Sequence, residues 1–385
     1  MIRHCLQAVA KGTSMKVNKL VVAPTIVLCL LLAACNAGGK PAQGAVGSHT
    51  VIDLAATDTV GPHGEKPTRV TDLALSPADA AKVKAGNYRA ALLWHEMSAW
   101  SSAVQRGAVD QFKNLGIRVV ATADAKFDPA TQANQIQNAL ATNPDVILGQ
   151  AVDPTTGAAA YRPAVVKGVK LVFADQAPIG FTYPKEYQAI VTGDLYQLGR
   201  RAAEALGQAM GGKGNVGILF YDAQFHVTNM RDSAFKKTLQ QKYPNIKIVA
   251  QQGFSDPNKA EDIANAMIAQ HPDLGGIYTS WAQPAQGVLA ALNNAGNTRT
   301  KLVTLDLDDT MATNMASGGV TVALACDRAY DFGRAMAVSA ALAILGKKAP
   351  EFGIVEAVTV TKSTLTDGYS AWDQQLPKAV KDALG

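Results

Sequence analysis

Short apolar segments alternate with longer amphipathic segments along most of the chain after residue 87. The first apolar segments are Arg89–Trp94, Arg118–Ala121, Val146–Gly149 and Lys170–Ala174, and a helix is predicted after the first of them at Ser98–Leu115. Short strands that alternate with helices of ten or more residues are typical of βαβ units in a parallel sheet. We therefore predict a parallel sheet in this part of the chain.

The same alternation starts again at a strand predicted for Ala189–Gly193. Further strands are predicted at Asn215–Phe220, Lys247–Gln251, Gly276–Thr279, Lys301–Leu305 and Val320–Ala325. Because these are more βα units than one sheet usually carries, we predict an α/β fold with two doubly wound, Rossmann-like lobes. Ligands of such sheets bind at the carboxyl ends of the strands.

Two segments of eighteen residues, 128–145 and 256–273, resemble each other. Each begins with Asp-Pro and ends with Pro-Asp, and five of the eighteen positions are identical. An Asp N-cap followed by Pro predicts the start of a helix, and the closing Pro predicts its end before the next strand. The repeat of this unit at a distance of 128 residues indicates two similar lobes.

Residues 1–34 have the pattern of a signal peptide. Lys16 and Lys19 precede the mostly apolar stretch Leu20–Leu32, which is too short to span a bilayer comfortably. Met15 begins a better signal than Met1. The stretch ends at Leu32–Cys35, which resembles the lipobox of bacterial lipoproteins, in which the Cys carries the lipid.

We therefore expect lipidation of Cys35; the alternative is an ordinary secretory signal with a coincidental Cys. Residues 35–50 are rich in Gly, Ala, Pro and Ser and predict a flexible tether. Residues 51–87 are interpreted as a leader segment with one short helix. Cys326 is the one cysteine left after Cys35 in the exported part, so no intrachain disulfide is expected there.

The net charge of +5 comes mainly from the signal peptide. Four basic residues and no acidic ones lie in residues 1–34, which leaves 32 basic against 31 acidic residues in the remainder. A nearly neutral body gives no electrostatic argument for nucleic-acid binding.

The chain has no catalytic signature: G-x-S-x-G, H-E-x-x-H, C-x-x-C and a complete P-loop are all absent. The histidines His95, His226 and His271 do not have the spacing of metal ligands. We therefore expect no enzymatic activity, no metal and no cofactor.

Aromatic and charged residues gather just after the predicted strands. They are Trp94, His95, Glu96, Trp100, Asp153, Asp175, Phe254, Trp281 and Asp306. Each could be an isolated loop residue, but their shared position predicts that they line a cleft at the carboxyl ends of the strands.

The stretch from Ala90 to Lys362 resembles the type I periplasmic sugar-binding proteins of bacterial ABC transporters. The resemblance is carried, in order, by Gly107, Pro144–Ile147, Gly168–Val172, Gly193-Asp194, Gly199, Gly212–Val216, Arg231–Phe235, His271–Asp273, Gly276-Ile277 and Gly333. Some members of the wider family are transcription repressors with an N-terminal helix-turn-helix. The signal at this end of the chain favours the exported receptor instead.

The resemblance implies two lobes that are joined by three crossing strands and close about a hinge. We expect the crossings near Asp175–Ala177, Cys326-Asp327 and Glu356-Ala357. Lobe one would then comprise residues 88–176 and 327–356, and lobe two residues 177–326 and 357–385, including the tail.

The resemblance also assigns ligand contacts. Trp100 and Phe254 match aromatic residues that stack on the two faces of a sugar ring. Asp153, Arg231 and Asp306 match charged groups that bond to hydroxyls.

The chain departs from the family pattern at two positions: Trp281 stands where many relatives have Asn, and Cys326 where many have Gln or Asp. Together with Trp94, Trp281 would narrow the pocket or favour a less hydroxylated ligand. The alternative is that Trp281 is rotated into its lobe and Asp327 replaces the lost polar group.

The implied function is that of a monomeric receptor, held to the membrane by lipid, that delivers a sugar or polyol to an ABC permease and its ATPase. One alternative is a sensory receptor that signals to a chemoreceptor or kinase. Another is a transport receptor for a less polar, non-sugar ligand. An exported enzyme acting through Glu96, His95 and the aspartates is disfavoured, because no nucleophile–base spacing supports it.

Overall fold

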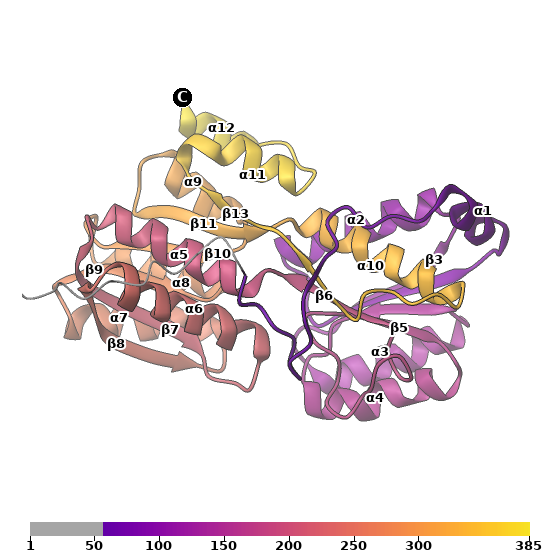
Figure 1. The fold of residues 1–385 in the computed structure, drawn as a ribbon. Coiled ribbons are helices and arrows are strands. Elements are labelled where there is room, and N and C mark those ends of the chain that lie inside the picture. The colour runs from indigo at the N-terminus through magenta and orange to yellow at the C-terminus, as the bar shows by residue number, and fades with distance from the viewer. Residues whose placement is uncertain (1–56) are drawn as a thin grey trace, which may run out of the picture. The chain divides into compact units, whose positions relative to one another are not determined.

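The computed structural model describes residues 57–385, which form two α/β lobes, each built on one sheet (Figure 1). The predicted signal peptide, Cys35 and the tether lie outside the described residues. Between residues 57 and 385, no helix combines the length and the apolar character needed to cross a membrane.

The first sheet has seven strands in the order β1-β12-β6-β5-β4-β2-β3, and all of its pairs are parallel. Helices α2 and α10 cover one face, and α3 and α4 cover the other (Figure 1). Strand β2 shows why: Ala90 and Leu92 pack toward the first pair of helices, and Ala91 and Leu93 toward the second. The strands are β1 (Thr68–Arg69), β2 (Arg89–Trp94), β3 (Arg118–Asp124), β4 (Val146–Gly149), β5 (Lys170–Ala174), β6 (Ala189–Gly193) and β12 (Phe352–Val355), and the helices are α1 (Pro77–Ala85), α2 (Ala99–Asn114), α3 (Pro129–Ala141), α4 (Pro154–Val166) and α10 (Ala329–Ile344).

The second sheet has the order β13-β11-β10-β9-β7-β8. All of its pairs are parallel except the edge pair of β13 with β11, which is antiparallel. Helices α5 and α6 cover one face, while α7, α8 and α9 cover the other. The strands are β7 (Lys213–Tyr221), β8 (Asn245–Phe254), β9 (Leu274–Thr279), β10 (Lys301–Leu305), β11 (Thr321–Asp327) and β13 (Ala357–Val360). The helices are α5 (Leu195–Ala209), α6 (His226–Lys242), α7 (Ala260–Gln270), α8 (Ala282–Asn294), α9 (Asp309–Ala316), α11 (Leu365–Ala371) and α12 (Lys378–Leu384), with 3-10 turns η1 (Pro257–Lys259) and η2 (Lys362–Thr364).

The two copies of the sequence repeat occupy equivalent places, because each follows an edge strand: β3 in the first sheet and β8 in the second. In the first copy, Asp128 accepts a hydrogen bond from the Thr131 amide at 2.5 Å and caps α3 as predicted. In the second copy, Asp256 caps the 3-10 turn η1 instead, and α7 begins only at Ala260. The prediction of two similar α/β lobes is confirmed.

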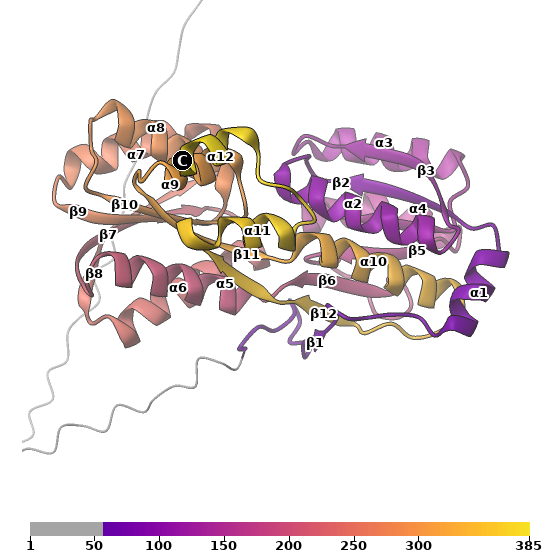
Figure 2. The same cartoon turned by 90° about the horizontal axis from the view of Figure 1, so that it is seen from above.

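The chain crosses between the lobes three times (Figure 2). The first crossing lies at Gly193-Asp194, and its prediction near Asp175–Ala177 was wrong. The reason is that β6 pairs with both β5 and β12, so residues 177–193 belong to the first lobe. The second crossing follows Asp327 at the end of β11, and the third lies at Glu356, between β12 and β13.

Residues 57–87, the described part of the leader segment, belong to the fold and contact both lobes. The hydroxyls of Thr57 and Thr59 donate to Asp194 at 2.5 and 2.6 Å, next to the first crossing. Farther on, β1 pairs with β12 of the first sheet. The segment therefore forms a further connection across the side of the molecule where the chain crosses.

Glycines allow two helix pairs to approach closely. A Cβ at Gly333 of α10 would lie 1.8 Å from the Val104 carbonyl oxygen of α2. In the second lobe, a Cβ at Gly199 of α5 would lie 2.0 Å from the carbonyl oxygen of Arg231 in α6. Both obstacles are backbone atoms, so the helices can come this close only because these residues have no side chain.

We predict that Gly199→Ala forces α6 away from α5 and lowers the free energy of unfolding by about 1–3 kcal/mol. Urea denaturation measures the loss. The control is Gly157→Ala in α4, where the nearest atom is the Ala151 side chain at 3.0 Å and no backbone obstructs. An equal loss in both variants would contradict the role given to the α5–α6 contact.

Candidate functional site

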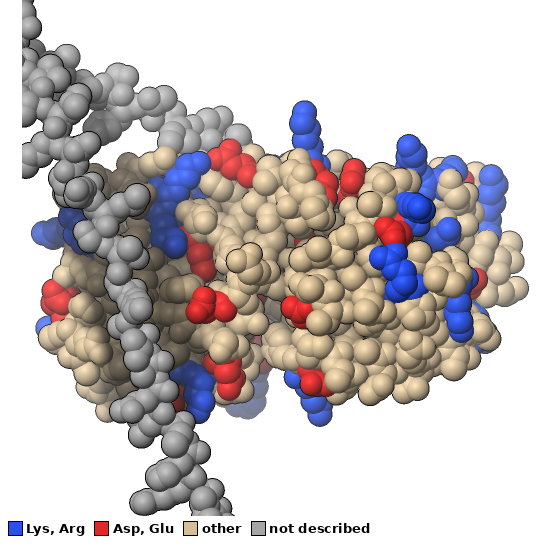
Figure 3. Space-filling model, turned by 90° about the horizontal axis from the view of Figure 1, so that it is seen from below, with Lys and Arg blue, Asp and Glu red and all other residues tan. Residues whose placement is uncertain are grey.

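A cavity of about 410 Å³ lies at the carboxyl ends of both sheets, between the two lobes. A second hollow of about 490 Å³, here called the mouth, adjoins the cavity and shares Glu96, Trp100, Phe127, Trp281 and Asp306 with it. Acidic side chains are visible on both sides of the seam between the lobes (Figure 3). Both lobes therefore contribute to one site, as the topology of parallel sheets favours.

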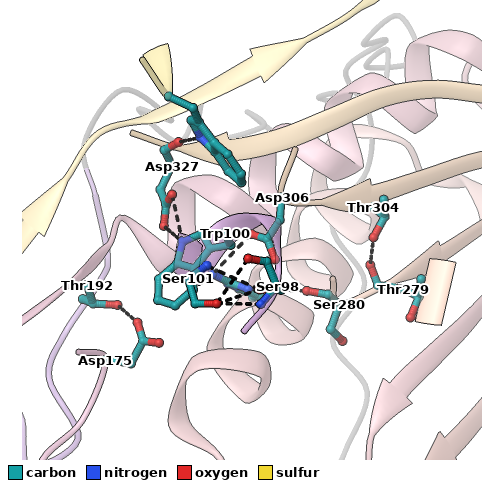
Figure 4. A network of polar contacts seen from close by, with 12 residues as sticks. Ser98, Trp100, Ser101, Asp175, Thr192, Thr279, Ser280, Thr304, Asp306 and Asp327 are labelled. Carbon is teal, nitrogen blue, oxygen red and sulfur yellow. Dashed lines mark hydrogen bonds and ion pairs between the residues drawn. The ribbon is translucent and has the colours of Figure 1, made fainter. Parts of the chain in front are cut away.

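Two aspartates come from equivalent positions of the two lobes. Asp175 follows β5 and Asp306 follows β10, and their φ angles are 65° and 68°, in the left-handed region. Asp tolerates this conformation better than most residues, although it costs energy. Asp175 accepts a hydrogen bond from Thr192 at 2.7 Å (Figure 4) and another from Gln150, also at 2.7 Å. Among residues 57–385, the Oδ1 atom of Asp306 has no hydrogen-bond partner.

Arg231 of α6 brings a buried cation to these carboxylates. The residue is only 6% exposed, yet its polar contacts are long: Ser280 O lies at 3.5 Å and Asp306 Oδ1 at 4.0 Å. Its Nε atom has no hydrogen-bond partner in the described part of the chain. The guanidinium thus keeps donors available at the cavity wall, where a bound molecule can accept from them.

Trp100 and Asp327 join the first lobe to the second crossing. The Trp100 indole N–H donates to both carboxylate oxygens of Asp327, at 3.2 and 3.0 Å (Figure 4). The indole ring also packs edge-on against Phe332 of α10, with centroids 5.3 Å apart. In addition, Trp372 donates to the backbone oxygen of Asp327 at 2.7 Å, so the C-terminal tail holds the same point.

Burial sets the protonation of the site. It raises the pKa of Glu96 to about 7, of Asp175 to about 6 and of Asp327 to about 7. It also raises the pKa of Asp306, against the opposing effect of Arg231. Burial lowers the pKa of His95 to about 3, so this imidazole is neutral near pH 7.

Aromatic rings stand on both sides of the cavity. In the second lobe, Trp281 packs edge-on against Tyr221 at 5.4 Å and is tilted against Phe254 at 5.2 Å. In the first lobe, His95 and Phe127 form an edge-on pair at 5.1 Å. Such rings can pack against the C–H faces of a ring-shaped ligand.

The structure brings seven of the predicted site residues together at the cavity. They are His95, Glu96, Trp100, Asp175, Arg231, Trp281 and Asp306. Trp281 is therefore not rotated into its lobe. Asp327 lies behind Trp100 and does not line the cavity.

Four other predicted residues do not line it. Trp94 is fully buried under α2 and donates to Gln105 at 2.9 Å. Asp153 caps α4 through the Thr156 amide. Phe254 is buried behind Tyr221 and Trp281, and Cys326 is buried in the core. Trp94, Phe254 and Cys326 lie at or near the ends of their strands. Successive side chains of a strand point to opposite faces of the sheet, and these three point to a face that is covered by the core.

Several lining residues were not predicted, among them Gln150, Tyr221, Thr228, Asp256 and Phe127. Gln150 follows β4 and Tyr221 ends β7. Because ligands of parallel sheets bind at the carboxyl ends of the strands, both residues could have been predicted from the sequence. Thr228 lies in the first turn of α6, and no local signal separates it from an ordinary helix residue. Within residues 57–385, no group of three or more His, Cys, Asp or Glu side chains could hold a metal ion.

Residues 66–348 match the family model described as periplasmic binding protein domain. A putative rhizopine-binding protein of Rhizobium meliloti is 24% identical over 57% of this chain and 73% of its own length. The D-allose-binding periplasmic protein of Escherichia coli is 26% identical over 67% of this chain and 87% of its own.

Among solved structures, an ABC transporter solute-binding protein from Agrobacterium vitis, bound with α-D-tagatopyranose, superposes with a TM-score of 0.68. It is 23% identical in sequence, and the match covers 75% of this chain and 100% of that one. This likeness shows a shared fold.

The raised pKa of Asp327 predicts a pH dependence of stability. Between about pH 4 and about pH 7, the folded protein holds a proton that an unfolded Asp has released, so the free energy of unfolding falls as the pH rises. Glu96 and Asp175 act in the same direction. Asp327→Asn keeps an acceptor for Trp100 and removes this proton.

We expect the loss of stability between about pH 5 and about pH 8 to be smaller in Asp327→Asn than in the parent protein. Urea denaturation at both pH values measures it. Asp262→Asn, on the exposed surface of α7, is the control and should keep the parent dependence. Parallel curves for Asp327→Asn and the parent would contradict the assignment.

Proposed function

This chain belongs to the family of periplasmic binding proteins, and from that membership we propose that it is the sugar or polyol receptor of an ABC importer. It is a solute-binding protein rather than an enzyme.

The observation that supports this function is the lining of the cavity: buried polar groups that lack hydrogen-bond partners stand beside aromatic rings. Arg231 Nε, Asp306 Oδ1 and Gln150 Oε1 are buried without hydrogen-bond partners among residues 57–385. A purely apolar ligand would leave them unpaired, at about 1–3 kcal/mol for each group. A hydroxylated ring supplies both donors and acceptors to them and offers its C–H faces to Trp281 and Phe127.

The names of two relatives agree with this chemistry. The Escherichia coli protein is named for D-allose, and the Agrobacterium vitis structure holds α-D-tagatopyranose. Both compounds are hydroxylated rings of a size that a cavity of about 410 Å³ can enclose.

The ligand would act by holding the two lobes together. Asp175 and Gln150 belong to the first lobe, and Arg231 and Asp306 to the second, so a molecule bonded to both sets favours the closed state. The three crossings are the segments about which the lobes would move. The closed receptor would then dock on the permease, whose partner ATPase drives import.

We further propose that the receptor works outside the cytoplasm, as a monomer anchored through lipidated Cys35. The support is the basic region at Lys16 and Lys19, the apolar stretch after it and the lipobox-like end Leu32–Cys35. An anchor of this kind, followed by the tether, would keep the receptor close to the permease.

We predict that monosaccharides or polyols raise the melting temperature of the purified protein. At a concentration of a hundred times Kd, a ligand adds about 2.7 kcal/mol to the free energy of unfolding. A thermal-shift screen should include D-allose and D-tagatose. Stabilisation by compounds of another class, and by none of these, would overturn the proposal.

In the same screen, Asp306→Asn should weaken binding of the stabilising compound by about tenfold or more, because a charged hydrogen-bond acceptor is lost. Asp262→Asn lies outside the cavity and serves as the matched control. Equal affinities in the two variants would remove Asp306 from the site.

Cys35→Ser should release the full-length protein from the membrane fraction when it is expressed in a bacterium that processes lipoproteins. Fractionation and intact-mass analysis check this. A parent protein without a mass increment at its N-terminal Cys would contradict the anchor and leave the binding proposal untouched.

A further inference from the structure

Carboxylates outnumber cations in the cavity and its mouth. The lining of the cavity includes the carboxyl groups of Glu96, Asp175, Asp256 and Asp306 and the cations of Lys126 and Arg231. The mouth adds Asp124 and Asp308 but no further Lys or Arg to this lining. Since His95 is neutral, the site carries a surplus of acidic groups that its own residues do not balance.

The cavity also has hydrogen-bond acceptors that lack donors, in addition to its surplus of acidic groups. Asp306 Oδ1 and Gln150 Oε1 are buried, and neither has a hydrogen-bond partner among the described residues. Gln150 is 2% exposed, and its amide orientation is set because its nitrogen donates to Asp175 at 2.7 Å. The side-chain oxygen of Gln150 is therefore an acceptor without a donor, at a residue that lines the cavity. A donor group of a bound molecule could fill it.

Glu96 and Asp306 face the same space from opposite lobes. Glu96 follows β2 of the first sheet and Asp306 follows β10 of the second, and both line the cavity and its mouth. Asp306 and Asp124 each help burial to raise the pKa of Glu96. Closure about a neutral ligand would bury these like charges together, and that is unfavourable unless one takes up a proton.

We propose that the ligand carries a protonated amine on its hydroxylated frame, as an amino sugar or amino polyol does, and that the ammonium group binds between Glu96 and Asp306. This inference rests on the proposed function and narrows its ligand. An ammonium group has three donors and no acceptor, which matches unfilled carboxylate and amide oxygens.

The remaining charged groups around this position are consistent with the assignment. Asp124 and Asp308 at the mouth add to its negative potential. Lys126 is exposed at the rim, where solvent and salt weaken its effect. Arg231 is engaged with Asp175, Asp306 and Asp327, and the His95 ring, whose Nε2 lies 3.8 Å from Glu96 Oε1, is neutral and brings no positive charge to this carboxylate.

The test is calorimetric titration with matched pairs: D-glucosamine against D-glucose, and D-galactosamine against D-galactose. At about pH 6.5, where the amine is charged, the amino compound of at least one pair should bind about tenfold tighter or more than its neutral partner. Glu96 is partly protonated there, so binding should release protons, seen as heats that vary with the ionisation enthalpy of the buffer. Affinity for the amino compound should rise from about pH 5.5 to about pH 7.

Variants assign the effect to the two residues. Glu96→Gln should reduce the preference for the amino compound about tenfold and lower the proton release, because the charge is lost while the shape is kept. Asp306→Asn should weaken binding of both members of a pair. Asp262→Asn, which changes charge equally on the exposed surface of α7, should keep both the preference and the proton release.

The outcomes separate this inference from the proposed function. Neutral sugars that bind as tightly as their amino partners would overturn the inference and leave the sugar receptor standing. An unchanged preference in Glu96→Gln would overturn the place given to the ammonium group. If neither member of any pair binds and the wider screen yields no sugar or polyol, both are overturned.

Discussion

The buried charge cluster around Arg231 is the constraint on which the rest of the structure depends. One guanidinium faces the carboxylates of Asp175, Asp306 and Asp327, and all three raise its pKa. The three come from the first lobe, the second lobe and a crossing segment. Buried charges are costly, and breaking such a set by removing one partner is costlier still. The apolar cores that cover the faces of the two sheets must supply the stability that offsets this cost.

The duplication of the α/β unit explains how the cluster is built. Equivalent strands, β5 and β10, end in an Asp with left-handed backbone, so two carboxylates reach the cavity from opposite sides. Arg231 has no counterpart in this symmetry: the equivalent glycine contact of the first lobe, between Gly333 and α2, falls on Val104, where that of Gly199 with α6 falls on Arg231. The contact of Gly199 with the Arg231 carbonyl oxygen therefore helps to set the position of this buried cation.

The site is polar, buried and incompletely bonded, and these properties together suit a receptor. Groups that already bonded one another fully would gain little from a ligand, whereas Arg231 and Asp306 approach each other only to 4.0 Å. A ligand that completes their bonds joins the lobes and gains affinity from both. The Trp100–Asp327 hydrogen bonds connect the wall of the same cavity to a crossing between the lobes.

Local sequence patterns predicted the elements, the two-lobe architecture and the strand ends after which His95, Glu96, Asp175, Trp281 and Asp306 lie, as well as the helix that carries Trp100, because periodicity, N-caps and turn residues are local properties. The sequence placed the first crossing wrongly, since β6 joins a sheet through pairing with β12, which lies more than 150 residues later. The folded arrangement was needed to show that Trp94, Phe254 and Cys326 turn into the core and that Asp153 caps a helix. Which face of a strand end looks into a cavity depends on the opposite lobe, and that lobe is not local in sequence.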